Sequence, residues 1–270
     1  MFEDVESFYA MCKKQLIYMA RYPINFITSF AIVFIIILMV IFATTLFIGK
    51  EETNYSFNAI AIYGMILFMF LSDTLWTIGY NIRWEQVQGT LEALYLTPAS
   101  KFASLISRVT ISIVWTGLNC IAAVIFVYYV FGALPFKNLI FSTIVLILTL
   151  SGTFGFGFCF AAFTLYLKES ANLAANVLQF VFMILCAMFF PFSVLPDSVL
   201  KISKLIPLSY GVDLFRSSLM GYPEGFPELL PVNQEFLIIL LFGIITPALG
   251  YLLYRKAEKK VRTDGSLGVY

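Results

Sequence analysis

Six stretches of this chain are almost free of charge, and they constrain its fold more than any other feature. A helix needs about 20 mainly apolar residues to cross the hydrocarbon core of a bilayer. Because backbone groups in lipid must hydrogen-bond within their own segment, such stretches are predicted to be α-helices. The windows are residues 22–49, 57–80, 109–136, 138–167, 170–196 and 236–254. The predicted fold class is an all-α integral membrane protein with six transmembrane helices.

The composition agrees with this prediction and removes several classes of function. The chain is 60% hydrophobic and 12% charged, whereas about a quarter of the residues in a soluble domain are charged. A net charge of +1 without a basic stripe argues against nucleic acid as a partner. Histidine is absent, which removes the commonest metal ligand. The four cysteines lack C-x-x-C spacing, so we predict no metal site.

The motifs of common catalytic sites are missing as well. The sequence contains no G-x-x-x-x-G-K-[ST] phosphate loop, no H-E-x-x-H and no G-x-S-x-G. We therefore expect no catalytic residue and no cofactor bound by this chain.

Lysine and arginine are distributed unevenly between the two sides of the predicted membrane domain. With six spans both termini lie on one side, and that side would carry 12 of the 17 lysine and arginine residues. Positive residues collect on the cytoplasmic side, so both termini and residues 82–101 are predicted to be cytoplasmic. We expect a multi-pass protein of the plasma membrane of a prokaryotic cell.

Two polar segments on this side have amphipathic patterns. Residues 1–22 carry apolar residues at helical spacing and charges on the other face, which predicts a helix lying in the interface. In residues 82–101, Thr97-Pro98 indicates a helix boundary. The apolar face of the preceding helix would hold Val87, Leu91, Leu94 and Tyr95. The segment is either a contact site for another protein, which Gly89 would let approach closely, or an ordinary interfacial helix.

Residues 191–221 are apolar but interrupted by proline. Pro191, Pro196 and Pro207 divide this segment into pieces too short to span. We predict short extracellular helices that dip into the outer leaflet or lie on it. In the second helix, residues 209–220, Asp213 could pair with Arg216 at a spacing of three.

Asp73 is the one charged residue inside the six windows. Intramembrane acids often mark a transport path or a proton relay. The alternative is a structural role, with hydrogen bonds to Ser72, Thr74, Thr77 or a neighbouring helix. We favour the structural role because no second acid for a relay is evident.

Small residues recur four apart in the window 138–167. Ser151 with Gly155, and Gly157 with Ala161, would allow close packing of helix backbones in lipid. A flexible hinge is the alternative, and packing is the favoured interpretation.

Two motifs resemble those of the type-2 ABC transporter permeases, close to the daunorubicin-resistance exporter branch. The first is Glu85-x-x-x-Gly89-Thr90-Leu91-Glu92-x-Leu94-x-x-Thr97-Pro98. The second is Pro191-Phe192-Ser193-x-Leu195-Pro196, followed by Pro207-Leu208-Ser209-Tyr210-Gly211-Val212-Asp213-x-x-Arg216. The resemblance covers essentially the whole chain, so residues 1–270 would form a single transmembrane domain.

The resemblance implies a permease subunit that exports a hydrophobic or amphipathic substrate. Two copies of a separate ATPase subunit would use ATP and Mg²⁺, and a second permease subunit would complete a homodimer in the lipid. Residues 1–22 would be a connecting helix, 82–101 a coupling helix and 191–221 re-entrant helices. The implied ATPase contacts are Glu85, Gly89, Thr90, Leu91, Glu92 and Leu94. The implied residues of the extracellular gate are Pro191, Pro196, Pro207, Asp213 and Arg216.

Two other functions are compatible with the same pattern. One is export of a polysaccharide or lipid-linked glycan by another branch of the same family. The other is an intramembrane enzyme or a structural membrane protein that acts without ATP.

Overall fold

The computed structural model describes residues 8–10, 12–13, 16–17, 20–48, 53–80, 88–89, 101–131, 134–167 and 170–263. Within these ranges all regular structure is helical and no strand occurs. Four stretches are long and apolar enough to cross a membrane: Asn58–Ile78, Ile106–Tyr129, Leu139–Leu165 and Val232–Val261. Two shorter apolar helices are Pro23–Met39 and Ala171–Leu185. The described residues between 8 and 17 are helical, and Tyr9, Leu16 and Ile17 are exposed.

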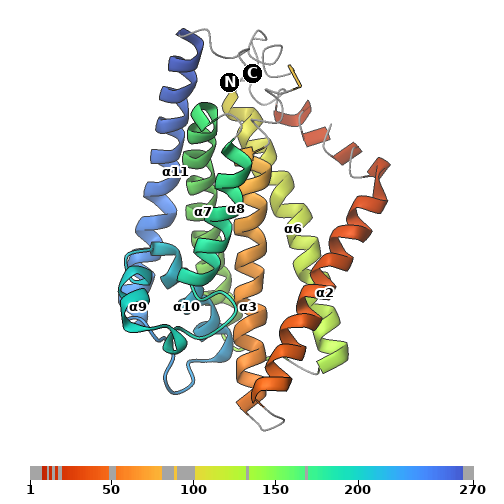
Figure 1. Ribbon diagram of the computed structural model, residues 1–270, viewed down its shortest axis with the longest axis vertical. Coiled ribbons are helices and arrows are strands. Elements are labelled where there is room, and N and C mark those ends of the chain that lie inside the picture. Colours follow the sequence, from red (N-terminus) through yellow and green to blue (C-terminus); the bar gives the residue numbers. More distant parts are fainter. Residues whose placement is uncertain are drawn as a thin grey trace.

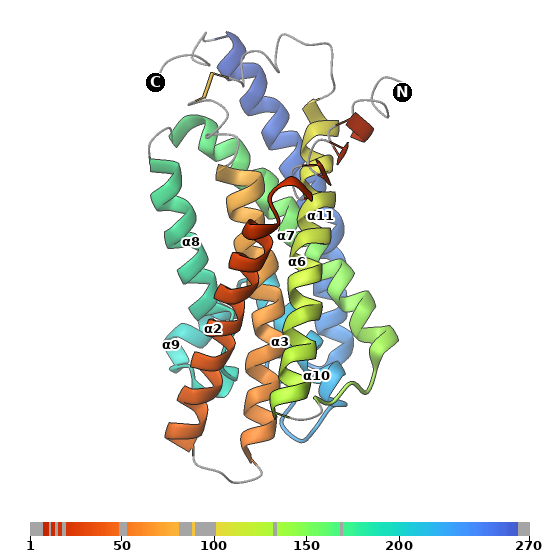
Figure 2. The ribbon, with the colours of Figure 1, turned by 90° about the vertical axis from the view of Figure 1, so that its right-hand side faces the viewer.

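The long helices run alternately up and down one bundle (Figure 1). They are α2 (Pro23–Ile48), α3 (Thr53–Asp73) with its π-helical continuation η1 (Thr74–Tyr80), α6 (Lys101–Phe131), α7 (Leu139–Leu167), α8 (Ala171–Leu185) and α11 (Val232–Thr263). Three short helices connect α8 to α11: η3 (Phe192–Val194), α9 (Asp197–Ser203) and α10 (Pro207–Met220). Figure 2 shows α9 and α10 at the end of the bundle where α8 ends.

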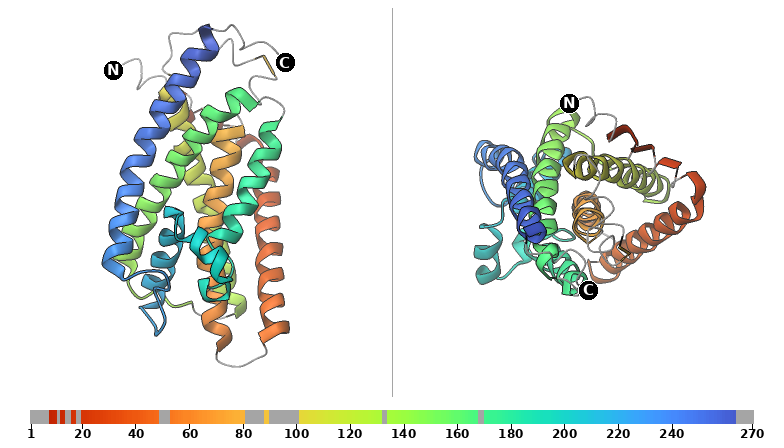
Figure 3. Two further views of the ribbon diagram at one scale, coloured as in Figure 1. Left: turned by 60° about the vertical axis from the view of Figure 1, so that its left-hand side comes forward. Right: turned by 90° about the horizontal axis from the view of Figure 1, so that it is seen from above.

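The central element of the bundle is α3. Seen along the bundle in Figure 3, α3 lies among α2, α6, α7 and α8. Of its spanning stretch, 67% is buried inside the structure, against 17% for the spanning stretch of α11. Movement of α3 must therefore displace the helices around it, whereas α11 presents most of its surface outward.

Small residues bring α7 and α11 into backbone contact. The Ser151 hydroxyl donates to the Gly243 carbonyl at 2.7 Å. A Cβ atom added at Gly155 would lie 2.3 Å from the backbone nitrogen of Pro247, inside α11. A Cβ atom at Gly250 would lie 2.3 Å from the Gly155 carbonyl oxygen. These contacts support the packing interpretation of the small residues.

The second small pair also serves packing, although against a different partner. A Cβ atom at Gly157 would lie 2.3 Å from Cγ2 of Thr74 in η1, and Ala161 is fully buried. The two pairs thus hold α7 between α11 on one side and η1 on the other.

The location of α10 differs from the sequence expectation. Residues 208–220 are all buried, and the helix packs against α7, α11 and α3. Small residues make this burial possible: a Cβ atom at Gly211 would lie 2.6 Å from Thr149 Cγ2. A helix expected at a lipid surface is thus part of the protein core.

Substitution of Gly155 by alanine should lower stability by about 1–3 kcal/mol, because the added methyl meets backbone atoms that cannot rotate away. The measurement is thermal unfolding of the purified protein in detergent. Gly117→Ala in α6 is the matched control, since no atom lies within 4 Å of its added Cβ and the change should stay within about 1 kcal/mol. Equal effects of the two substitutions would contradict the packing described for Gly155.

Candidate functional site

The motif in residues 82–101 lies largely outside the described residues. Glu85, Thr90, Leu91, Glu92 and Leu94 belong to that part, and the structure says nothing about them. Within the motif Gln88 and Gly89 are described, and they form a turn. Gly89 has a φ of 67°, a left-handed conformation that glycine adopts without a steric penalty. At these two residues the chain turns, whereas the sequence pattern predicts a helix that continues through them.

Asp73 lies where α3 passes into η1, and its carboxylate accepts hydrogen bonds from three hydroxyl groups. Thr77 donates to Oδ1 at 2.7 Å. Thr116 of α6 donates to Oδ2 at 2.8 Å, and Ser112 of the same helix also donates to Oδ2. The carboxylate therefore crosslinks α3 to α6. This geometry favours the structural interpretation over a proton relay. Of the other expected partners, Thr74 donates to the Phe70 carbonyl instead, at 2.6 Å.

The second cluster lies in the segment between α8 and α11, residues 186–231, which we call the connecting module. The three prolines mark its element boundaries, as the sequence predicts. Pro191 and Pro196 are the N-caps of η3 and α9, and Pro207 is in the first turn of α10. Pro is suited to helix starts because its missing N–H would have no partner there.

Arg216 holds the end of α8 in place. Its side chain is 1% exposed, and Nη2 donates to the carbonyls of Ala187, at 2.7 Å, and Met188. Nη1 donates to the carbonyl of Phe190 at 3.2 Å. Ala187 has a φ of 46°, in the left-handed region where a helix commonly ends with glycine. These carbonyls follow the last turn of α8, and the guanidinium gives this irregular buried backbone its hydrogen-bond partners.

Gly64 of α3 makes room for this arrangement. A Cβ atom at Gly64 would lie 1.8 Å from the Met188 carbonyl oxygen and 2.1 Å from Nη2 of Arg216. Sequence reasoning missed Gly64, because one glycine within an apolar window carries no signal of which segment will approach it.

Asp213 binds the backbone of the loop that precedes α11. Its Oδ2 accepts the backbone N–H groups of Glu228, at 2.7 Å, and Leu229, at 2.8 Å. The carboxylate of Glu228 in turn accepts the N–H groups of Phe192, at 3.0 Å, and Ser193, at 2.6 Å. Burial is the largest influence on Asp213 and raises its pKa to about 6.

The expected pairing of Asp213 with Arg216 is replaced by these separate bonds. The two residues influence each other electrostatically, but each one hydrogen-bonds to backbone groups of a different segment. The physical reason is that irregular buried backbone has unpaired N–H and C=O groups, and ionised side chains form strong bonds with them.

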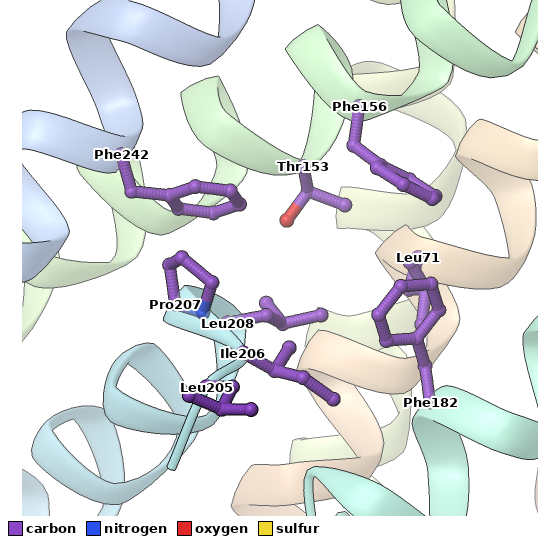
Figure 4. A pocket seen from close by; sticks show the side chains of 9 residues that line it. All are labelled: Leu71, Thr153, Phe156, Phe182, Leu205, Ile206, Pro207, Leu208 and Phe242. Carbon is purple, nitrogen blue, oxygen red and sulfur yellow. The ribbon is translucent and has the colours of Figure 1, made fainter. Parts of the chain in front are cut away.

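An apolar cavity of about 240 Å³ lies beneath the connecting module (Figure 4). Its lining comes from α3, α7, α8, α11, the turn after α9 and the start of α10: Leu71, Thr153, Phe156, Phe182, Leu205, Ile206, Pro207, Leu208 and Phe242. The hydroxyl of Thr153 donates a hydrogen bond to the Thr149 carbonyl at 2.8 Å. The cavity therefore suits an apolar group. Of its residues the second motif contains Pro207 and Leu208, and the residues on α3, α7, α8 and α11 carried no signal because they come from separate elements.

Comparison with protein families gives a match over most of the chain. The family model described as ABC-2 type transporter matches residues 6–220, which contain Asp73, the motif in residues 82–101 and all of α10. No curated protein sequence matches the chain.

Asp73→Asn should lower stability by about 1–3 kcal/mol while the protein still inserts and folds, since an amide offers one acceptor oxygen where the carboxylate offers two. Thermal unfolding checks this in a double-mutant cycle with Ser112→Ala, whose effect should shrink in the Asp73→Asn background. Unchanged stability together with abolished transport would instead favour a role for Asp73 in substrate movement.

Arg216→Lys should destabilise the protein by more than about 2 kcal/mol, because one ammonium group cannot reach the three carbonyls that the guanidinium spans. Lys201→Gln, at an exposed position of α9, is the control and should change stability by less than about 0.5 kcal/mol. Unfolding temperatures of the two variants report the difference, and a wild-type value for Arg216→Lys would refute its role in holding α8.

Proposed function

The chain belongs to the ABC-2 type transporter family, and from that premise we propose that it is the permease subunit of an ATP-driven exporter. The match over residues 6–220 is the observation that carries this proposal. A separate ATPase subunit, in two copies, would supply the energy from ATP and Mg²⁺. Two permease chains would form a homodimer around the path of the substrate.

The proposed topology has six spans with both termini in the cytoplasm of a prokaryotic cell. The spans would be α2, α3 with η1, α6, α7, α8 and α11, whose alternating directions support the assignment (Figure 1). The distribution of lysine and arginine supports the orientation. With 15 residues, α8 is about 22 Å long, so the connecting module would begin within the outer leaflet and form the extracellular gate.

Residues 82–101 are proposed as the contact with the ATPase, with residues 1–22 as the connecting helix. Polar contacts from Glu85 and Glu92 would orient the ATPase, and Leu91 or Leu94 would be the buried anchor. ATP binding can move the permease only if these contacts differ between two conformations. The segment follows η1 directly in the chain, so a shift would reach α3 at the centre of the bundle.

The cavity supports a hydrophobic or amphipathic substrate. Residues 205–208 form its wall on the side of the connecting module, so movement of that module would open the cavity to the outside. An apolar lining suits an apolar moiety better than a polysaccharide, which favours the daunorubicin-resistance-like branch of the family.

Leu91→Asp and Gly89→Trp should abolish ATP-dependent transport and substrate stimulation of ATPase activity, because each one blocks the proposed contact. Both variants should insert into the membrane at wild-type levels. Gln88→Ala is the control, since Gln88 is exposed in the same turn. The measurement is ATPase activity and co-purification of the ATPase with each variant. Full stimulation in both blocked variants would reject residues 82–101 as the contact, and transport by the purified chain alone would reject the proposed function.

A further inference from the structure

Two buried carboxyl groups hold one short segment of the connecting module between them. Asp213 of α10 is 1% exposed, and Glu235 in the first turn of α11 is 0% exposed. Asp213 Oδ2 accepts the N–H groups of Glu228 and Leu229. Glu235 Oε1 accepts the N–H group of the next residue, Leu230, at 3.1 Å. Each acid thus uses one oxygen atom to fix residues 228–230.

The second oxygen atom of each acid has no such donor. Neither Asp213 Oδ1 nor Glu235 Oε2 receives a hydrogen bond from any N–H or hydroxyl group among the described residues, although both atoms are buried. The two acids bind the N–H groups of consecutive residues, Leu229 and Leu230, so their carboxyl groups lie near each other, where a hydrogen bond between the two unpartnered oxygen atoms would satisfy both. A carboxylate can only accept, so such a bond requires one of the two groups to be protonated.

We propose that Asp213 and Glu235 share one proton, held between Oδ1 of Asp213 and Oε2 of Glu235. The proton gives both unpartnered oxygen atoms a partner and removes the repulsion between two buried negative charges in contact. The shared proton also joins α10 to the start of α11, and it thereby holds the connecting module in place beside the cavity. This is a proton-binding site, and its occupancy does not depend on the proposed transport function.

The charged surroundings favour retention of the proton. Arg216 contributes one positive charge from α10, whereas Glu228 contributes a second negative charge from the loop. Tyr210 and Tyr222 lie within the electrostatic reach of Glu235, and Cys186, at the end of α8, lies within that of Arg216. Residues 139–167 of α7 and 58–72 of α3 carry no charge, and the Lys137 side chain lies next to Gly221. Arg216 offsets only one of the negative charges that remain while the pair holds its proton, and loss of the proton would add a further negative charge to this buried site.

The shared proton determines how the stability of the fold changes with pH. Burial raises the pKa of Asp213 above its ordinary value, and the shared proton is bound more tightly in the folded protein than in the unfolded chain. The contribution to stability is thus fully present at low pH and is lost as the pH rises through the folded-state titration of the pair.

The test combines thermal unfolding with infrared spectroscopy of the full-length purified protein. Between pH 6 and pH 10, the unfolding temperature of the wild type should fall by at least about 3 °C more than that of Glu235→Gln. The glutamine amide replaces the proton by donating to Asp213 Oδ1 while its oxygen still accepts from Leu230. Glu224→Gln removes an exposed acid from the same module and should behave as the wild type does.

Infrared spectra at neutral pH should show the C=O band of a protonated carboxylic acid in the wild type and lose it in Glu235→Gln. This readout needs only one variant that folds, and Asp213→Asn can take the place of Glu235→Gln. A wild-type spectrum without the band would overturn the proposal. Stabilisation of the wild type by Mg²⁺ or Ca²⁺ that is absent in Glu235→Gln would also overturn it, since a metal ion and not a proton would then occupy the pair.

Discussion

The contacts of Arg216 with the carbonyls that follow α8 are the interaction on which the connecting module depends. In the hydrocarbon core of a bilayer no water is present to hydrogen-bond the N–H and C=O groups of non-helical backbone. Such backbone is therefore stable only where other protein groups form these hydrogen bonds. Arg216 does this for the carbonyls of Ala187, Met188 and Phe190. Asp213 and Glu228 do the same for N–H groups on the other side of the module. The charged residues of this region therefore stabilise irregular backbone.

The bundle around this module is held by small and hydroxyl-bearing residues in addition to large apolar ones. Gly155 and Gly250 let α7 and α11 touch through their backbones. Asp73 with its three hydroxyl donors joins α3 to α6. Apolar side chains gain little from choosing protein over lipid, so close backbone contact and hydrogen bonds determine which helices pair. The result is a rigid centre at α3 with an apolar cavity between it and the connecting module.

The sequence predicts the elements of this fold better than their contacts. Uncharged windows identify the apolar helices, and Pro191, Pro196 and Pro207 identify the short ones, because both signals are local. The pairing of Asp213 with Arg216 could not be judged from a spacing of three, since their actual partners are backbone groups 15 or more residues away. Gly64 and the cavity residues on α3, α7, α8 and α11 gave no signal for the same reason: their roles arise only when distant segments meet. The match to the family covers the motifs, and the structure adds the bonds that these motifs form.

The absence of a side chain at Gly64 limits how the central helix can travel. Arg216 and the Met188 carbonyl rest directly on the bare backbone of α3. Successive residues of an α-helix point about 100° apart, so turning α3 about its own axis would drive a neighbouring side chain, such as that of Tyr63, into the space they occupy. The helix can tilt or slide only if the end of α8 and the whole of α10 go with it. A displacement of the far end of α3 would therefore move the helix along or across its axis. Rotation of α3 about its own axis is blocked by the Arg216 guanidinium packed on Gly64.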